Sequence, residues 1–411
     1  MFSLSSRLRT SAAGLTAAVA ALALGAACPP AASAAEGTIL NANTPDSVAG
    51  SYLVHFRQSA ALGAADITER ANQLAARHGG QLRHVYDAVG GFAVDMNEAA
   101  AKRLAAEPSV EFVEQDKVVR ASGEQTDPVW GLDRIDQRNL PLDRKYTYPD
   151  NAGAGTTVYV VDTGVDVEHP EFEGRAKHGY DFIDDDDEAE DCHGHGTHVA
   201  GTVAGATYGV AKKANIVGVR VLDCSGYSRG SSVVSGLNWV AKNAQKPAVV
   251  NMSLGGSANS STDRAVRSLV NAGVTVAVAA GNENQDACNV SPARVREAIT
   301  VAASDSADKR SIWRAPNVAS NYGRCVDLFA PGSNILSAKP GGGTATMGGT
   351  SMATPHVAGA AALYLGQPGN SAKSPSEVAD ALLSASTPGK IRDVKGSPNK
   401  LLYVGFLNQD A

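Results

Sequence analysis

The chain has 411 residues, with 36 Lys and Arg against 42 Asp and Glu, so its formal charge is −6, and 43% of its residues are hydrophobic. Nucleic-acid backbones and anionic membrane surfaces are bound by clustered basic residues, and this sequence has no basic run longer than a pair. We therefore expect a soluble protein with neither kind of partner, long enough for a large core and a second domain.

The N-terminus has the parts of a secretory signal peptide. Two arginines precede an apolar stretch over residues 12–27, and residues 32–34 (Ala-Ser-Ala) are small, as a signal peptidase requires. A membrane anchor is the alternative, but the apolar run is shorter than the ~20 residues that span a bilayer and is followed by Pro29-Pro30. We expect residues 1–34 to be a signal peptide and the protein to be secreted and extracellular.

Four cysteines remain once the signal peptide is removed. An even number in an exported chain predicts two disulfides. A zinc site is the competing interpretation, but no C-x-x-C pair occurs and the cysteines are scattered. Four cysteines allow three pairings, and their spacing alone does not choose among them. They are Cys192, Cys224, Cys288 and Cys325.

Residues 51–120 are predicted to form a small α+β domain. Period-two alternation indicates strands and apolar residues at helical spacing indicate helices, in the order strand, helix, strand, strand, helix, strand. This order predicts a ferredoxin-like fold of about 70 residues. The polar segment 121–128 is predicted to be an exposed linker. The assigned elements are strands at 51–56, 91–94 and 110–114, and helices at 67–78 and 97–104.

From about Thr156 the pattern changes to short apolar runs that alternate with helical segments. Such runs are typical of strands buried on both faces by crossover helices. The alternation predicts an α/β fold, with a doubly wound, mostly parallel sheet covered by helices on both faces. The predicted strands are 157–161, 216–222, 248–254, 274–280 and 298–303, and the predicted helices are 198–206, 231–243, 263–271, 352–365 and 375–384.

Two reactive side chains stand beside glycines near the ends of these elements. Asp162 ends the run 157–161, so its carboxylate is expected at the carboxyl edge of the sheet, where open α/β folds bind ligands. Alone, such an aspartate is more often a turn or cap residue. His195 begins a helix rich in Gly and Ala, three residues before His198. Metal ligation by this pair is the rival interpretation, but no H-E-x-x-H glutamate accompanies it.

A third reactive side chain, Ser351, follows residues 348–350 (Gly-Gly-Thr) and begins another helix. Its hydroxyl is expected at the positive end of the helix dipole, beside free backbone N–H groups that can stabilise an oxyanion. For an isolated serine, a helix cap is the simpler interpretation. We expect His193 to be exposed and structural, His198 to lie in the interior, and His356 to be structural.

Three segments together resemble the subtilisin-like serine peptidases, and most closely the branch that includes proteinase K and aqualysin. They are Asp162-Thr163-Gly164, residues 195–201 (HGTHVAG) and residues 349–355 (GTSMATP). Their order, Asp then His then Ser, is that of subtilisins and not of chymotrypsin-like enzymes. The resemblance covers most of residues 128–404 and implies a subtilisin-like fold. The domain before it resembles the inhibitor-type propeptide of the same family.

The resemblance implies a secreted serine endopeptidase and gives each residue a role. Ser351 attacks the scissile carbonyl, His195 takes its proton and passes it to the leaving amine, and Asp162 orients the imidazole. The backbone N–H of Ser351 and the side chain of Asn282 hold the oxyanion. Without the resemblance, Asn282 would be interpreted as a turn residue.

The resemblance also implies that the enzyme is made as a precursor and processes itself. Residues 35–122 are expected to be a propeptide that assists folding and inhibits the enzyme as an intramolecular partner. Residues 123–411 are expected to be the peptidase domain, a monomer that acts on polypeptides. The cut is expected near residues 120–123, although Arg120-Ala121-Ser122 lacks the hydrophobic residue expected there.

By the same resemblance, an extended substrate pairs with two backbone strips. One contains Ser253, Leu254 and Gly255, and the other runs from Cys224 to Gly226. The pocket for the side chain before the cut is bounded by the first strip, by Ala279 to Gly281 and by the segment near Val290. No fixed charge lies there, so apolar or aromatic side chains are expected. Proteinase K has tyrosines where this chain has Val290 and Gly230, and Tyr227 is additional.

The resemblance selects one cysteine pairing and implies a structural cofactor. The pairs are Cys192 with Cys224 and Cys288 with Cys325. The cofactor is Ca²⁺, held by Asp327 and the carbonyls of Arg296 and Ala298, with Asp133 and Asp136 as candidates for a second site. The acidic run at 184–187 is expected to be a solvated loop.

Two functions of other classes compete with the peptidase. A catalytically silent, secreted peptide-binding protein on the same fold would lack a triad or oxyanion residue, and all four are present. An adhesive cell-surface protein predicts repeats or a sorting tail, which the sequence does not contain.

Overall fold

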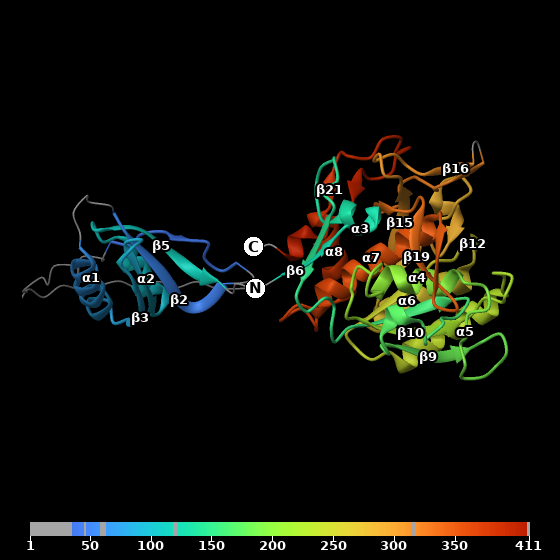
Figure 1. Ribbon diagram of the computed structural model, residues 1–411, viewed down its shortest axis with the longest axis horizontal. Helices are drawn as coiled ribbons and strands as arrows, with labels where there is room; N and C mark the ends of the chain where they lie inside the picture. Colours follow the sequence, from blue (N-terminus) through green and yellow to red (C-terminus); the bar gives the residue numbers. More distant parts are fainter. Residues whose placement is uncertain (1–34, 45–46, 58–62, 118–121, 315–316, 409–411) are drawn as a thin grey trace, which may run out of the picture. The chain divides into compact units, whose positions relative to one another are not determined.

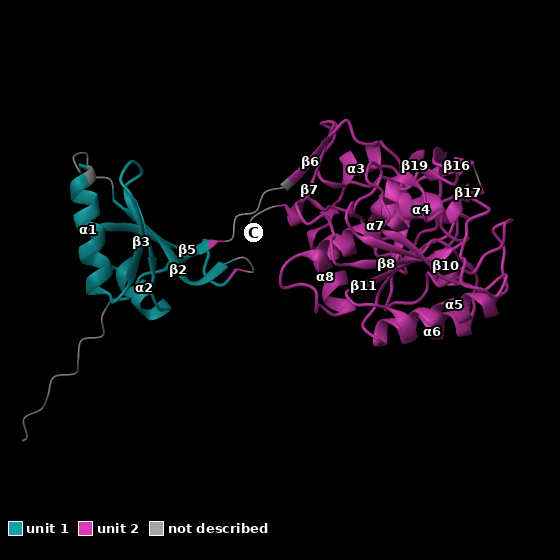
Figure 2. Ribbon diagram, turned by 60° about the horizontal axis from the view of Figure 1, so that its bottom comes forward, with its two compact units in different colours: residues 1–43, 47–116 teal, residues 44–46, 117–411 magenta. Residues whose placement is uncertain are grey.

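The computed structural model describes residues 35–44, 47–57, 63–117, 122–314 and 317–408. The predicted signal peptide lies outside these residues, as does the segment 118–121 beside the predicted cut. The described part forms two compact units: the first contains residues 35–43 and 47–116, and the second contains residues 117–408 together with Thr44 (Figure 2). None of the helices in the described ranges combines the length and apolar character that crossing a bilayer requires.

The first unit is a five-stranded sheet with two helices. Its strand order is β1-β5-β2-β4-β3, so the predicted ferredoxin-like arrangement is confirmed, with the short β1 added at the edge. Both helices share one core with the sheet, centred on Val54, Phe92 and Leu104. Asn97 caps α2 by accepting the N–H of Ala100 (2.9 Å). The elements are β1 (Ile39–Leu40), β2 (Ser47–Phe56), α1 (Ala64–Arg77), β3 (Gln81–Tyr86), β4 (Gly91–Asp95), α2 (Glu98–Ala105) and β5 (Val110–Lys117).

The second unit is built on a nine-stranded sheet of order β21-β22-β18-β15-β13-β11-β8-β10-β9 (Figure 1). Every neighbouring pair is parallel except β21 with β22. The predicted α/β fold with a doubly wound, mostly parallel sheet is therefore confirmed. The sheet strands are β8 (Thr157–Asp162), β9 (Ala176–Asp181), β10 (Asn215–Arg220), β11 (Ala248–Met252), β13 (Thr275–Ala279), β15 (Ile299–Ser304), β18 (Leu328–Pro331), β21 (Thr387–Pro388) and β22 (Lys400–Leu401).

Helices cover both faces of this sheet. Along β8, Val158 and Val160 belong to one core, whereas Tyr159 and Val161 belong to the other, because side chains alternate along a strand. Residues of α4, α7 and α8 fill the first core, and residues of α5 and α6 fill the second. The helices are α3 (Trp130–Ile135), α4 (His195–Ala204), α5 (Gly230–Asn243), α6 (Ser260–Asn271), α7 (Thr350–Gly366) and α8 (Pro375–Ala385).

Short elements surround the nine-stranded sheet. They are the strands β6 (Ser122–Thr126), β7 (Lys145–Pro149), β12 (Gly256–Ser257), β14 (Val290–Ser291), β16 (Ile312–Arg314), β17 (Val318–Ala319), β19 (Ile335–Lys339) and β20 (Gly343–Met347), and the 3₁₀ turns Pro170–Phe172, Ala287–Asn289 and Gly405–Leu407.

Helix α7 is apolar on all sides and runs through the middle of the unit. Fourteen of its 17 residues are buried. A side chain at Gly359 would come within 2.6 Å of Val210 Cβ, so glycine allows the helix to pack closely there. This packing fixes the first turn of α7, which carries Ser351.

The predicted linker at 121–128 is wrong over most of its length. Ser122–Thr126 forms β6, which pairs antiparallel with β7 from Ser122 opposite Pro149 to Thr126 opposite Lys145. The pairing rests on backbone hydrogen bonds, which polar residues at a surface edge can make as well as apolar ones. Composition alone therefore missed the strand.

Removing a buried ion pair should destabilise this unit much more than removing an exposed ion pair. Arg134 is fully buried and donates to both carboxylate oxygens of Asp308 (2.7 and 3.0 Å). Arg134→Met leaves a buried carboxylate without its partner and should lower the free energy of unfolding by about 3–5 kcal/mol. Arg144 pairs with Asp127 at the surface, so Arg144→Met should cost less than about 1 kcal/mol.

Urea denaturation of the inhibited mature protein measures both changes. Equal losses of unfolding free energy in the two variants would contradict the assignment of Arg134 as a buried structural cation.

Candidate active site

A buried carboxylate at the end of β8 contacts the first residue of α4. Asp162 is fully buried, and its Oδ1 lies 2.6 Å from Nδ1 of His195. The same oxygen accepts the N–H of Thr163 (2.8 Å). A carboxylate on Nδ1 leaves Nε2 of the imidazole as the atom that can accept a proton.

The surroundings favour the protonated form of His195. Burial lowers the pKa of this side chain, but the carboxylate of Asp162, and further that of Asp191, raise it, and the resulting pKa is above the ordinary value of 6.5. The neutral form, which a general base needs, therefore predominates only at pH values above this raised pKa.

Asp191 holds the loop that carries His195. Its two carboxylate oxygens accept the hydroxyls of Thr163 (2.8 Å) and Thr197 (2.6 Å) and the N–H groups of His193, Gly194 and Thr197 (3.0, 2.7 and 2.8 Å). These bonds link the end of β8 to the first turn of α4. Sequence reasoning did not single out Asp191, although an acidic residue just before a helix is a signal for capping its free N–H groups.

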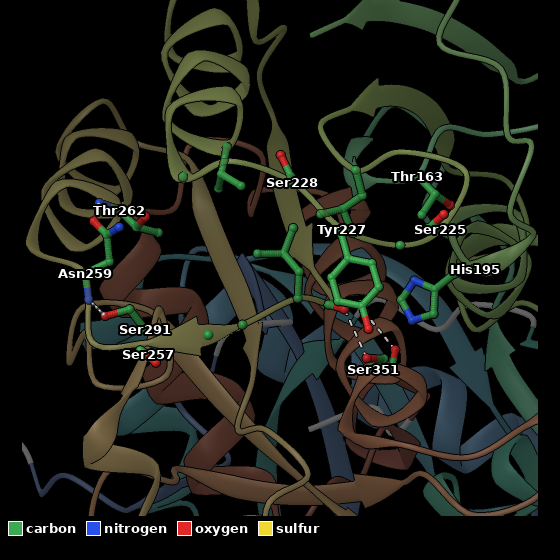
Figure 3. A pocket seen from close by; sticks show the side chains of 18 of the residues that line it. Thr163, His195, Ser225, Tyr227, Ser228, Ser257, Asn259, Thr262, Ser291 and Ser351 are labelled. Carbon is green, nitrogen blue, oxygen red and sulfur yellow. Dashed lines mark hydrogen bonds between the residues drawn. The ribbon is translucent and has the colours of Figure 1, made fainter. Parts of the chain in front are cut away.

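Ser351 lies in the first turn of α7 and exchanges hydrogen bonds with Ser253. Its hydroxyl donates to the carbonyl of Ser253 (3.0 Å), and the hydroxyl of Ser253 donates back to the carbonyl of Ser351 (2.7 Å). Asn251 on β11 donates in turn to the Ser253 hydroxyl (2.9 Å). Ser351 and His195 line the same end of one cleft, where Figure 3 places both side chains.

Two donors converge next to Ser351. The side-chain oxygen of Asn282 accepts both the N–H and the hydroxyl of Thr350 (2.9 Å each). The other end of the amide, its NH₂ group, therefore points away from Thr350. A Cβ placed on Gly349 would lie 3.6 Å from Asn282 Nδ2 and 3.6 Å from the backbone N of Ser351. Both nitrogens therefore lie at the same distance from one point, which no side chain occupies because residue 349 is glycine. Thr350, which orients the amide, was not identified from the sequence.

The cleft has a volume of about 590 Å³ and contains most of the predicted substrate residues. Ser253, Leu254, Gly255 and Gly226 line it, as do Asn282, Gly230 and the exposed ring of Tyr227. Ala279 and Gly281, predicted to bound the first side-chain pocket, are not among the lining residues. Ala279 is instead buried at the last position of β13. Val290 is buried behind Gly255, and its Cγ1 lies 3.4 Å from the position that a Cβ on residue 255 would take.

Two further histidines are structural, as expected. Burial lowers the pKa of His198 to about 4, and its Nε2 lies 3.0 Å from the carbonyl of Ile335. Burial likewise lowers the pKa of His356 to about 4, and its Nδ1 lies 2.8 Å from the carbonyl of Met352. Both are neutral at physiological pH; the bond of His198 ties α4 to the first residue of β19, whereas the bond of His356 lies within α7.

Two disulfides join Cys192 to Cys224 and Cys288 to Cys325. This is the pairing that the family resemblance implied. The first bridge ties the loop of His195 to the loop that follows β10, so two walls of the cleft are linked covalently. The guanidinium of Arg220 lies beside both sulfurs of that bridge, at 3.4 and 3.6 Å.

The candidate calcium ligands include two partly buried carboxylates with raised pKa values. Burial raises the pKa of Asp327 to about 6, although the N–H of Thr300 donates to it (2.7 Å). Burial raises the pKa of Asp136 to about 7, with Asp143 and Asp133 also contributing. One oxygen of Asp136 is buried and has no hydrogen-bond partner in the part of the chain that the structure describes. These oxygens suit a hard cation, but within the described ranges no three acidic, His or Cys side chains group as a metal site, so backbone carbonyls would be needed.

Comparison with known proteins gives the same picture as the geometry. Residues 153–404 match the subtilase family (Peptidase_S8), and residues 51–122 match peptidase inhibitor I9. The chain is 49% identical to an extracellular serine proteinase of Thermus sp. (strain Rt41A), over 92% of this chain and 95% of that protein. It is 47% identical to alkaline serine exoprotease A of Vibrio alginolyticus, over 89% of this chain and 69% of that protein.

A solved structure shares the fold. The crystal structure of a cold adapted subtilisin-like serine proteinase matches with 54% identity and a TM-score of 0.65, over 68% of this chain and 99% of that one. The chain is therefore a serine peptidase, a hydrolase of peptide bonds, and it belongs to the subtilase family.

Proposed function

We propose that this chain is a secreted, self-processing serine endopeptidase whose catalytic residues are Asp162, His195 and Ser351. The observation that carries the proposal is the point near Gly349 at which Asn282 Nδ2 and the Ser351 N–H converge. A hydroxyl, an imidazole oriented by a buried carboxylate, and two donors for a developing oxyanion are the parts that acyl transfer needs.

In the proposed reaction, Ser351 first turns its hydroxyl from the Ser253 carbonyl toward Nε2 of His195. The serine oxygen attacks the scissile carbonyl while His195 takes the hydroxyl proton, and Asp162 stabilises the imidazolium that results. Asn282 and the Ser351 N–H stabilise the oxyanion. His195 then gives the proton to the leaving amine, and water hydrolyses the acyl enzyme by the reverse sequence.

The cleft suits the interior of a polypeptide. Its lining residues in the described part of the chain include no Asp, Glu, Lys or Arg that could hold a free chain terminus. Binding through backbone strips at Ser253–Gly255 and around Gly226 tolerates many sequences, and Leu254 and Val233 supply apolar surface. We therefore propose endopeptidase activity with a broad preference for apolar or aromatic side chains before the cut.

We further propose that residues 35–122 form an inhibitory propeptide and that residues 123–411 form a monomeric mature enzyme. The I9 match over residues 51–122 supports the first part. The signal peptide expected at residues 1–34 and the extracellular relative from Thermus support secretion.

Calcium is proposed as a structural ion. Asp327, with the carbonyls of Arg296 and Ala298, would hold one ion, and Asp133 with Asp136 would contribute to a second site. When bound, the ion neutralises carboxylates whose burial disfavours their charge; no catalytic step uses it.

Intact-mass spectrometry with a phenylmethylsulfonyl-type serine reagent tests the catalytic proposal. The secreted wild-type chain should begin near residue 123 and gain one adduct. The Ser351→Ala chain should gain none and should stay joined to its propeptide, because it lacks the nucleophile for its own cleavage. A folded, mature wild-type chain without adduct would instead favour the silent peptide-binding alternative.

Removal of the amide donor tests the oxyanion site. Asn282→Ala should lower kcat about 10²- to 10³-fold with little change in KM, a range carried over from another subtilisin. Asn271→Ala, an exposed position at the end of α6, is the matched control and should leave both constants unchanged. If kcat of Asn282→Ala stays within threefold of wild type, Asn282 does not hold the oxyanion.

Calcium should stabilise the fold more at pH 8 than at pH 5. Without metal, the pKa of Asp136 is about 7 in the fold and near 3.8 when unfolded, so its contribution to stability is lost as pH rises from about 4 to 7. Calcium binds the carboxylate form of Asp136. At a calcium concentration one hundredfold above Kd, binding raises the free energy of unfolding by about 2.7 kcal/mol.

Thermal unfolding of the inhibited enzyme, with calcium or with a chelator, measures this difference. Asp136→Asn should abolish the pH dependence of the calcium effect at this site, and Asp327→Asn tests the other site separately. A calcium effect that is the same at both pH values would contradict the assignment of Asp136.

A further inference from the structure

The turn that carries Asn282 follows the buried strand β13 and lies against a distant segment of the chain. The N–H of Ala319, the last residue of β17, donates to the carbonyl of Asn282 (3.0 Å). Two isolated backbone bridges join residues 283–286 to residues 319–322. The turn is therefore held from outside as well as by the strand from which it emerges.

The side chain of Asn321 is at the centre of this contact. It is fully buried, and its oxygen accepts the N–H groups of Glu283 and Gln285 (3.0 Å each). Its NH₂ group donates to the carbonyl of Ala280 and to Oε2 of Glu283 (2.8 Å each). A primary amide has two donor hydrogens and two acceptor lone pairs. Asn321 uses all four with residues on either side of Asn282.

Glu283 connects the buried amide to the backbone of Asn282. Its Oε2 accepts the N–H of Asn282 (2.9 Å) as well as the NH₂ group of Asn321. Gly281 has a φ of +98°, and a Cβ there would collide with Nδ2 of Asn321. Glycine at this position therefore allows the amide of Asn321 to approach the turn closely.

Two separate sets of contacts thus determine where the amide of Asn282 points. Thr350 holds its side-chain oxygen, whereas Asn321 and Glu283 hold the backbone from which the side chain extends. A donor stabilises a developing oxyanion only if it is in place before the reaction. A misplacement of about 1 Å can lower the rate about 10²-fold.

Asn321 acts from behind the cleft. Asn282 lines the cleft, but Asn321 does not, and none of its surface is exposed to solvent. A bound peptide cannot contact it. Its effect on the reaction must therefore pass through Asn282, and the binding of the substrate itself should not depend on it.

We propose that Asn321 is a positioning residue for the oxyanion donor Asn282, with Glu283 as the link between the two side chains. The four hydrogen bonds of Asn321 fix the turn, and the fixed turn directs the amide of Asn282 toward the developing charge. This inference rests on the proposed function, because it requires Asn282 to be the oxyanion donor.

Replacement of Asn321 by an apolar residue of similar size tests the proposal. In the mature enzyme, Asn321→Leu removes all four bonds and should lower kcat about 10- to 100-fold, with KM within about twofold of wild type. Titration with the serine reagent counts the folded enzyme, so kcat is expressed per reactive Ser351. A folded Asn321→Leu enzyme whose kcat stays within about threefold of wild type would overturn the inference.

A matched control lies at the other end of α7. Asn151 also ties a loop together with its side-chain amide, which donates to the carbonyl of Gly366 and accepts the N–H of Gly153 (3.4 Å for the second bond). Asn151→Leu removes these bonds about 20 Å along the helix from Ser351 and should leave kcat and KM unchanged.

A double substitution separates positioning from general support of the fold. If Asn321 acts through Asn282, adding Asn321→Leu to Asn282→Ala should lower kcat by less than a further factor of about two, because the amide is already absent. The same loss in both backgrounds would overturn the inference. If Asn282→Ala alone leaves kcat unchanged, the proposed oxyanion site fails first, so the two failures are distinguishable.

Glu283 provides a test that does not disturb the core. It is exposed, so Glu283→Ala should fold even if Asn321→Leu does not. Loss of its Oε2 removes two of the bonds and should lower kcat about three- to tenfold. Glu283→Gln keeps an oxygen that can accept both bonds, so its kcat should stay within about twofold of wild type. A Glu283→Ala enzyme with unchanged kcat would overturn the inference.

Discussion

The burial of one carboxylate organises the active site. Asp162 ends a strand that is covered on both faces, so its charge is removed from water and must be met by donors of the protein. His195 and the N–H of Thr163 both donate to one oxygen of this carboxylate, Oδ1. The other oxygen has no partner among the described residues. A histidine in this position is held in one orientation and has its pKa raised.

The hydrogen bonds of the neighbouring residue Thr163 hold the same region of the active site. Thr163 follows Asp162 directly, and its hydroxyl donates to Asp191 while accepting the N–H of Gly196 (2.9 Å). Glycine is required at 196, since a Cβ there would come within 2.0 Å of the carbonyl of Gly164. The end of β8 and the start of α4 thus pack backbone against backbone, and the positions of Asp162 and His195 cannot vary independently.

Much of this architecture could be predicted from the sequence, and the rest depended on tertiary contacts. Apolar runs located β8, β11 and β13, because strands buried on both faces carry an unbroken apolar pattern. The position of Asp162 at a strand end was visible for the same reason. Asn282 needed the family resemblance, since nothing local distinguishes an oxyanion donor from a turn residue. Thr350 and Asp191 were missed because their partners lie far away or in a loop without periodicity.

The strand β6 has a consequence for the proposed maturation. A cut near residues 120–123 would create a new chain end at the first residues of β6, which pair residue by residue with β7 up to Thr126. Backbone hydrogen bonds hold that end in the sheet instead of leaving a loose tail. A tethered end is a poor competitor for the cleft and a poor target for neighbouring enzyme molecules, so the pairing would protect the product from the activity that made it.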